Sequence, residues 1–139
     1  MSAENLDFPE GTALVLGGSG GVGSAIVAEV ASRKIPVCMT YQSNRERAEE
    51  IADGIRNSGG IVSTAQVSLQ DIESLKRCVK DIVDRGRLHS VFIATGYDIP
   101  QVSIADLTPE LWLRVLRADA EGVFNAIYTT LPQLRTGGG

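Results

Sequence analysis

Residues 12–23 read TALVLGGSGGVG, so a short apolar run passes directly into a turn made almost entirely of glycine. An apolar run that stops at such a turn is typical of a buried strand leading into a helix. The N–H groups at the start of that helix can bind an anion, and glycine lets a diphosphate approach the backbone closely. The spacing Gly17-xxx-Gly21-x-Gly23 lacks the lysine that an ATP-hydrolysing phosphate loop needs. The stretch therefore predicts a dinucleotide-binding loop, and the alternative is a turn that only packs the helix on the sheet.

On either side of this loop, strand-like apolar runs alternate with segments whose apolar residues recur at helical spacing. Such alternation favours parallel strands joined by right-handed helical crossovers, in a doubly wound α/β sheet. A ligand of such a sheet binds beyond the carboxyl ends of the strands where the strand order reverses, here beside the first and fourth strands. Strands are predicted at 12–16, 36–41, 61–67 and 91–94, and helices at 22–34, 45–58, 71–86 and 108–131, the last ending because Pro132 follows.

Composition narrows the class of protein. The 139-residue chain is 43% hydrophobic, and its length suits one core, so we expect a single domain over residues 1–139. The net charge is −4 and the Lys and Arg residues are scattered, which argues against a nucleic-acid partner. No apolar stretch approaches the roughly 18 residues of a membrane span and no basic-then-apolar leader opens the chain, so we expect no membrane partner and a cytoplasmic location. Cys38 and Cys78 are interpreted as buried thiols, not as a disulfide framework or a metal cluster.

Three segments, in this order, resemble the short-chain dehydrogenase/reductase family. The turn in 16–23 is similar to the family's Thr-Gly-xxx-Gly-x-Gly, and 86–96 is similar to its fourth-strand segment, which usually ends Asn-Asn-Ala-Gly. The segment 112–124 is similar to the helix with Asn-x-x-Gly-x-Phe. The resemblance runs almost end to end and is closest to the 3-oxoacyl-reductase type. It implies a Rossmann-type doubly wound parallel sheet in three αβα layers, truncated after the fourth strand and helix.

The resemblance implies an oxidoreductase that transfers a hydride between NADP(H) and a small carbonyl or alcohol substrate. Leu16 stands in place of the usual threonine, and Ile93 and Ala94 replace the two asparagines. Asp119 replaces the helix asparagine that supports the family's proton relay, and it is the one candidate catalytic residue. The family's serine and its Tyr-xxx-Lys pair do not occur in this sequence. We therefore expect this chain to carry the cofactor-binding half and to be inactive alone.

The end of the second predicted strand bears on the choice of cofactor. NAD-selective sites usually place an acid about 20 residues beyond the glycines, whereas this chain has Thr40-Tyr41-Gln42-Ser43-Asn44-Arg45 there. NADP is the expected cofactor, with NAD possible, and Arg45 is either a phosphate ligand or a solvated residue of the first helical turn. Ser68 stands where relatives often have an aspartate near the adenine. The expected cofactor-binding residues are Gly17, Gly18, Ser19, Gly20, Gly21, Val22, Gly23, Tyr41, Gln42, Ser43, Arg45, Ser68, Leu69, Ala94, Thr95 and Gly96.

Four other side chains have alternative interpretations. His89, the only histidine, is interpreted as a residue at the entry of the fourth strand and not as a general base. Tyr97 and Asp98 follow that strand, where they could contact nicotinamide or substrate, or cap the loop. Trp112 is expected to be a packing residue on the last helix.

Three functions compete on this sequence. The first is the oxidoreductase described above. The second is a non-catalytic module that holds a dinucleotide, which the replacements at 93–94 and at Asp119 would suit. The third is an assembly module, in which the edge of the fourth strand and the last helix dock onto another chain. The resemblance also implies a homo-oligomer.

Overall fold

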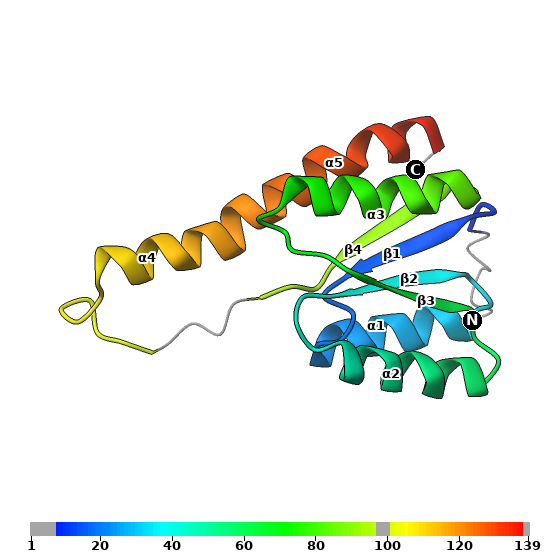
Figure 1. The fold of residues 1–139 in the computed structure, drawn as a ribbon, viewed down its shortest axis with the longest axis horizontal. Helices are drawn as coiled ribbons and strands as arrows, with labels where there is room; N and C mark the ends of the chain where they lie inside the picture. The colour runs from blue at the N-terminus through cyan, green and yellow to red at the C-terminus, as the bar shows by residue number, and fades with distance from the viewer. Residues whose placement is uncertain (1–7, 97–100, 138–139) are drawn as a thin grey trace, which may run out of the picture.

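The computed structural model describes residues 8–96 and 101–137. Its centre is a parallel sheet of four strands in the order β3-β2-β1-β4 (Figure 1). The strands are β1 (Thr12–Leu16), β2 (Val37–Tyr41), β3 (Val62–Gln66) and β4 (Leu88–Ile93). The order reverses at β1, which lies between β2 and β4, as the alternation of strands and helices predicts.

Helices cover both faces of the sheet. On one face lie α1 (Gly21–Ser32) and α2 (Arg45–Asn57), and on the other lie α3 (Ile72–Arg85) and α5 (Gly122–Gly137) (Figure 1). This arrangement confirms the expected α/β class, a Rossmann-like sheet between two helical layers.

The strand β1 separates two hydrophobic cores and is buried against both. Ala13 and Val15 face the core beneath α1 and α2, whereas Leu14 and Leu16 face the core beneath α3 and α5. A strand buried on both faces needs apolar residues at every position, which explains the unbroken run in the sequence. The α1/α2 core consists of Ala13, Val15, Val27, Val30, Ala31, Ile35, Val37, Met39, Tyr41, Ala48, Ala52 and Val62. The α3/α5 core consists of Leu14, Leu16, Cys38, Val67, Leu69, Leu75, Cys78, Val79, Ile82, Leu88 and Ala126.

The fourth strand begins earlier than the sequence predicts, at Leu88 and not at residue 91. Leu88 is buried in the α3/α5 core and pairs with Thr12 of β1. The register between β1 and β4 shifts after Thr12, so that Ala13 pairs with Ser90 and His89 is the extra residue. The polar residues at 89 and 90 interrupt the apolar run, which is why the pattern alone placed the start too late.

The last helical region also differs from the prediction of one helix ending at residue 131. It consists of α4 (Pro109–Leu116), a five-residue π-helix η1 (Arg117–Glu121), and α5, which continues through Pro132 to Gly137. Proline lacks the N–H that helix continuation uses, so it was expected to end the helix. The helix continues because Leu134, beyond the proline, packs against the α3/α5 core.

The two cysteines are buried, as expected, and the fold also brings them together. Cys38 lies on β2 and Cys78 on α3, and both belong to the α3/α5 core. The interaction between the two thiols lowers the pKa of Cys38. The same interaction, together with burial, raises the pKa of Cys78 far above its usual value. The 40-residue separation in the sequence gave no indication of this contact.

His89 is buried at the start of β4, at the end of the sheet opposite the glycine turn. Its Nδ1 lies 2.9 Å from Ser90 Oγ, and its Nε2 has no hydrogen-bond partner among the described residues. Burial, followed by the positive charge of Arg87, lowers the pKa of His89, and a backbone hydrogen bond at Gly11 opposes this. This placement agrees with a residue of strand entry and gives it no contact with a site at the other end.

Because its pKa is lowered in the folded state, His89 binds a proton more readily when the chain is unfolded, where its pKa is about 6.5. The stability that neutral, buried His89 contributes to the folded state is therefore present above about pH 6.5 and is lost as the pH falls below it. We expect the melting temperature of the wild type to fall more steeply from about pH 7 to about pH 5 than that of His89→Gln. Parallel melting curves for the two proteins across this range would contradict the prediction.

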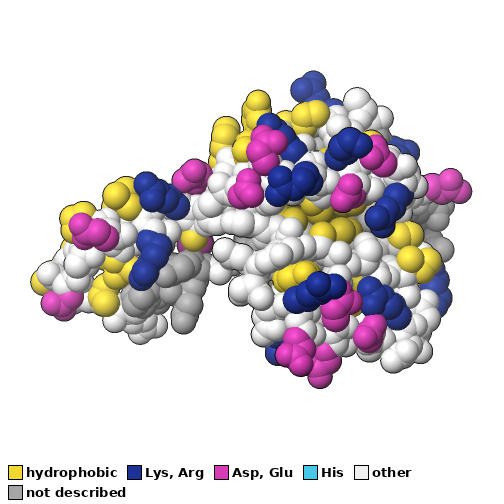
Figure 2. All heavy atoms as spheres, in the orientation of Figure 1, with side chains coloured by type: hydrophobic (Ala, Val, Ile, Leu, Met, Phe, Trp, Pro, Cys, Tyr) yellow, Lys and Arg dark blue, Asp and Glu magenta, His cyan; other side chains and the backbone are white. Residues whose placement is uncertain are grey.

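Exposed apolar side chains gather on α4 and α5 (Figure 2). Trp112, expected to be a packing residue, is half exposed, and Phe124 stacks on Tyr128 with 5.9 Å between ring centroids. Among the described residues, no helix combines the length and apolar character needed to cross a membrane. We call the following residues the apolar face: Trp112, Leu113, Leu116, Phe124, Ile127, Tyr128 and Leu131.

Candidate functional site

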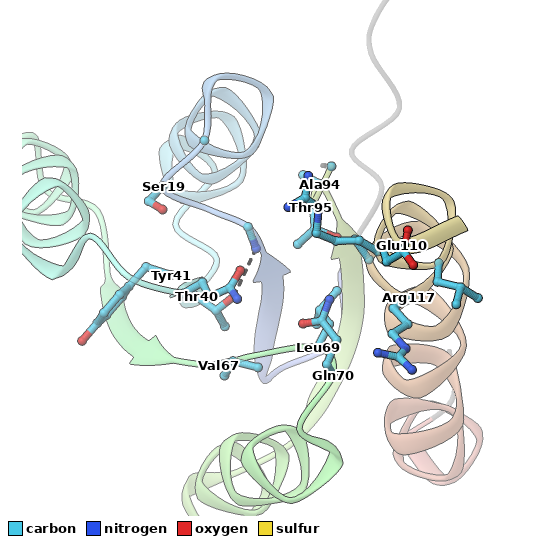
Figure 3. A pocket seen from close by; sticks show the side chains of 17 residues that line it. Ser19, Thr40, Tyr41, Val67, Leu69, Gln70, Ala94, Thr95, Glu110 and Arg117 are labelled. Carbon is cyan, nitrogen blue, oxygen red and sulfur yellow. Dashed lines mark hydrogen bonds between the residues drawn. The ribbon is translucent and has the colours of Figure 1, made fainter. Parts of the chain in front are cut away.

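The glycine turn is held between two strands of the sheet. Gly17 follows β1 with φ +79°, a conformation that favours glycine, and its N–H donates to Thr40 Oγ1 on β2 at 3.1 Å (Figure 3). A Cβ at Gly17 would lie 2.8 Å from the carbonyl oxygen of Ala94, just after β4. The turn therefore occupies the reversal point of the sheet.

The remaining glycines of the turn have two different roles. A Cβ at Gly23 would lie 2.0 Å from the Gly17 carbonyl oxygen, and one at Gly18 would lie 2.6 Å from Met39 Cβ. These two positions need glycine because the helix and the sheet pack closely there. By contrast, a Cβ at Gly21 would meet no heavy atom within 4 Å. Gly21 therefore faces open space at the start of α1.

The N-terminus of α1 differs from those of the three neighbouring helices. Side chains of Asn44, Asp71 and Thr108 accept hydrogen bonds from the first turns of α2, α3 and α4. At α1 the cap residue is Gly20, no side chain caps the helix, and the first turn contains no acid. The N–H groups of that turn and the positive end of the helix dipole are thus free of competing protein oxygens on side chains. Such a terminus suits an anionic ligand.

A cavity of about 760 Å³ opens beside this terminus, within the size range of cofactor sites (Figure 3). Its walls come from the glycine turn, from the carboxyl ends of β2, β3 and β4, and from α4 with η1. The lining residues are Gly17, Ser19, Gly20, Thr40, Tyr41, Gln42, Val67, Leu69, Gln70, Ala94, Thr95, Gly96, Glu110, Leu113, Arg114, Arg117 and Ala118.

The structure brings many of the residues expected to bind cofactor to this cavity and leaves others beside it. Those in the lining are Gly17, Ser19, Gly20, Tyr41, Gln42, Leu69, Ala94, Thr95 and Gly96. Outside the lining are Gly18, Gly21, Val22, Gly23, Ser43, Arg45 and Ser68, together with the candidate catalytic residue Asp119, which lies exposed on η1. Tyr97 and Asp98 lie outside the described residues.

Arg47 is a cation bonded to the glycine turn, and no motif in the sequence indicates it. Its Nε donates to the carbonyl oxygen of Ser19 at 3.0 Å. Asn44 caps α2 by accepting from the Arg47 N–H, which fixes Arg47 in the first turn. Arg45 and Arg47 are both exposed and both lie outside the cavity lining, but of the two Arg47 is the one hydrogen-bonded to the glycine turn. The guanidinium of Arg47 is therefore held beside the turn and the end of β2.

The loop after β3 is fixed by hydrogen bonds from two helices. The Ser68 N–H donates to Ser74 Oγ of α3 at 3.1 Å, and Ser74 Oγ donates to the Ser68 carbonyl oxygen at 3.0 Å. Asn125 Nδ2 of α5 donates to the carbonyl oxygen of Leu69 at 2.9 Å. The loop thus presents the buried side chains of Val67 and Leu69 to the cavity in a fixed position.

The wall formed by α4 and η1 was not anticipated from the sequence. Its lining residues recur at helical spacing, so they form one stripe along the helix. That spacing is visible in the sequence, but it does not reveal that the helix lies across the strand ends. The stripe consists of Glu110, Leu113, Arg114, Arg117 and Ala118.

Comparison with known proteins agrees with this geometry. The family model described as short chain dehydrogenase matches residues 11–139. The chain is 26% identical to versicolorin reductase of Emericella nidulans over 137 residues, which is 99% of this chain and 52% of that protein. It is 25% identical to a 3-oxoacyl-[acyl-carrier-protein] reductase of Staphylococcus aureus over 123 residues, 88% of this chain and 50% of that protein. The chain therefore spans about half the length of these curated relatives.

A solved structure shares both the fold and part of the sequence. The 3-ketoacyl-ACP reductase of Sinorhizobium meliloti 1021 superposes with a TM-score of 0.85 and 28% identity, over 92% of this chain and 50% of that one. A glycine turn at the reversal point, a cavity at the strand ends and a family match over nearly the whole chain agree with one another. The chain belongs to the short-chain dehydrogenase family.

Proposed function

We propose that the cavity binds NADP and that the protein is an oxidoreductase, with this chain as its single dinucleotide-binding domain. The observation that carries the proposal is the uncapped N-terminus of α1, which opens beside a cavity of about 760 Å³ at the glycine turn. Family membership supports it, because short-chain dehydrogenases use nicotinamide dinucleotides. When bound, the reduced dinucleotide would supply a hydride to a carbonyl substrate, and the oxidised dinucleotide would accept one from an alcohol.

The residues present fit the parts of a dinucleotide. The N–H groups at Gly20 and Gly21 would hold the diphosphate, since Gly21 leaves the space beside it open. Thr40, Tyr41 and Gln42 at the end of β2 offer polar groups for the first ribose. The residues after β4, Ala94, Thr95 and Gly96, would adjoin the nicotinamide half.

The charge near the end of β2 favours the 2′-phosphate of NADP over the bare ribose of NAD. Among the residues that the structure describes, Glu110 is the only acid in the cavity lining, and it lies on α4 and not at the end of β2. Arg47 lies beside Ser19, next to the ribose position, and a guanidinium pairs well with a phosphate. Arg47, and not Arg45, is therefore the proposed ligand of the 2′-phosphate.

Binding measurements on variants of these two arginines test the proposal. We expect the wild type to bind NADP at least about tenfold more tightly than NAD, since one charged hydrogen bond contributes about 1.5 kcal/mol or more. Arg47→Met should weaken NADP about tenfold and leave NAD within about twofold. Arg45→Met is the matched control on the same helical turn and should change neither. Isothermal titration calorimetry gives the constants, and a tenfold preference of the wild type for NAD would overturn the proposal.

Two other functions remain as alternatives. A non-catalytic dinucleotide-binding module would use the same cavity, and the replacements at residues 93, 94 and 119 would suit it. Turnover of NADPH with carbonyl compounds by the whole protein distinguishes the two. An assembly module is favoured by the apolar face, because large apolar side chains lie exposed along both α4 and α5. That face also supports the expected homo-oligomer.

A further inference from the structure

We propose that Arg117 stacks its guanidinium group on the adenine base of the bound dinucleotide, so that η1 contributes directly to recognition of the base. This inference rests on the proposed dinucleotide function of the cavity. It assigns a ligand contact to a residue that neither the sequence motifs nor the family match single out.

The cavity has chemically different walls. Near the end of β2 the lining is polar, with Thr40, Tyr41 and Gln42. Beyond the end of β3 the lining contains the apolar side chains of Val67 and Leu69, which are 5% and 8% exposed, followed by the polar Gln70. A ribose and its phosphate match the first wall, and a flat aromatic base matches the second. The adenine of a dinucleotide whose diphosphate lies at α1 is thus expected beside Val67 and Leu69.

Arg117 lies across the cavity from the ends of β1 and β2, on the wall nearest Leu69. Figure 3 shows its side chain extending from the helix toward the side of the cavity where Leu69 and Gln70 lie. Its neighbour Ala118 also lines the cavity and is small. A planar guanidinium opposite the side chains of Val67 and Leu69 can cover the free face of a base that is bound against them.

One end of the helical wall, the junction of η1 with α5, is anchored on the loop that carries Val67 and Leu69. Asn125 Nδ2 donates to the Leu69 carbonyl oxygen, and a Cβ at Gly122 would lie 3.0 Å from Leu69 Cβ. The junction of η1 with α5 therefore packs directly on the loop that carries Leu69. The π-helical turn at 117–121 lies immediately before this junction, and such turns are frequent at functional sites.

Arg117 is available for such a contact. In the described ranges, 8–96 and 101–137, it forms no ion pair, and the acid that shares the cavity wall, Glu110, lies seven residues earlier. A guanidinium is planar and weakly hydrated, and it stacks on aromatic faces better than an ammonium does. A contact of this kind strengthens binding about fivefold.

The competing interpretation is that Arg117 pairs with a phosphate group. Two measurements distinguish a phosphate contact from a base contact. Lysine keeps the charge and would retain most of a phosphate contact, whereas its ammonium is not planar and would retain only part of a contact with a base. A phosphate contact also depends on which phosphates the ligand carries, whereas a base contact does not.

The test compares the wild type with Arg117→Leu, Arg117→Lys and the control Arg135→Leu, whose side chain is exposed in the last turn of α5 and outside the cavity lining. AMP, 2′,5′-ADP and NADP are titrated by calorimetry. We expect Arg117→Leu to weaken all three ligands by the same factor, about fivefold, Arg117→Lys to weaken all three by a smaller common factor, and Arg135→Leu to change none. In NMR spectra of the wild type, AMP should shift the Arg117 Cδ protons upfield through the ring current of the base.

Each other outcome is informative. Full affinity in Arg117→Leu overturns the inference, as does retained affinity in Arg117→Lys or a loss that grows with the 2′-phosphate. If the wild type itself binds neither AMP nor NADP, the proposed function fails, and the inference fails with it. If each variant has the melting temperature of the wild type, the changes in affinity reflect binding and not folding.

Discussion

Gly23→Ala is expected to destabilise the fold by at least about 3 kcal/mol and to abolish dinucleotide binding. The new methyl group would lie 2.0 Å from the Gly17 carbonyl oxygen and 3.0 Å from Gly18 Cα. These are backbone atoms, so no side chain can rotate away to make room. The turn itself cannot shift freely, because the Gly17 N–H is bound to Thr40 and the residue lies close to Ala94. Equilibrium unfolding in urea measures the loss.

Gly21→Ala is the matched control within the same turn. An added Cβ at Gly21 meets no heavy atom within 4 Å, and Gly21 is the first residue of α1, where alanine is a better helix former. We expect its free energy of unfolding to equal or exceed that of the wild type. Dinucleotide affinity should nevertheless fall about tenfold or more, since the methyl group enters the space where the diphosphate would lie. Equal destabilisation by the two substitutions would contradict the assignment of separate roles to these glycines.

The second large effect is expected in the α3/α5 core. Leu75 of α3 has no solvent exposure and is among the largest fully buried side chains. Leu75→Ala removes apolar contacts and leaves a cavity, for which we expect a loss of about 3 kcal/mol in the free energy of unfolding, with an unchanged urea m-value.

Val83→Ala, on the same helix, is the control for Leu75→Ala. Val83 is 36% exposed, so its truncation should cost less than about 1 kcal/mol. A similar cost for both substitutions would show that α3 does not pack on the sheet as the structure describes.

The parts of the fold that local patterns determine could be predicted. The apolar run of β1 and the glycines after it place a strand, a turn and a helix in consecutive residues, because each step depends on neighbours in the sequence. The asparagine cap at Asn44 and the cap at Asp71 likewise set helix starts close to those expected. The order of the strands followed from their alternation with helices.

Features that depend on distant residues could not be predicted. Arg45 and Arg47 are two positions apart, which is about 200° around a helix, so they lie on nearly opposite sides of α2. Only the packing of α2 on the sheet decides which of the two arginines reaches the glycine turn. The contact of Cys38 with Cys78 depends on how α3 crosses β2. The continuation of α5 through Pro132 depends on the packing of Leu134 against a core whose members the sequence alone does not identify.

The wall of the cavity formed by α4 and η1 contains no buried residue. Its ordering therefore adds little to the cooperative stability of the molecule, and this segment can open at a lower free energy than the sheet and its flanking helices. A ligand that spans the strand ends and this helix would supply the contacts that the wall lacks. Part of the binding free energy would then offset the cost of immobilising the wall. The measured affinity would therefore be weaker than the affinity for a wall that is already ordered before the ligand binds.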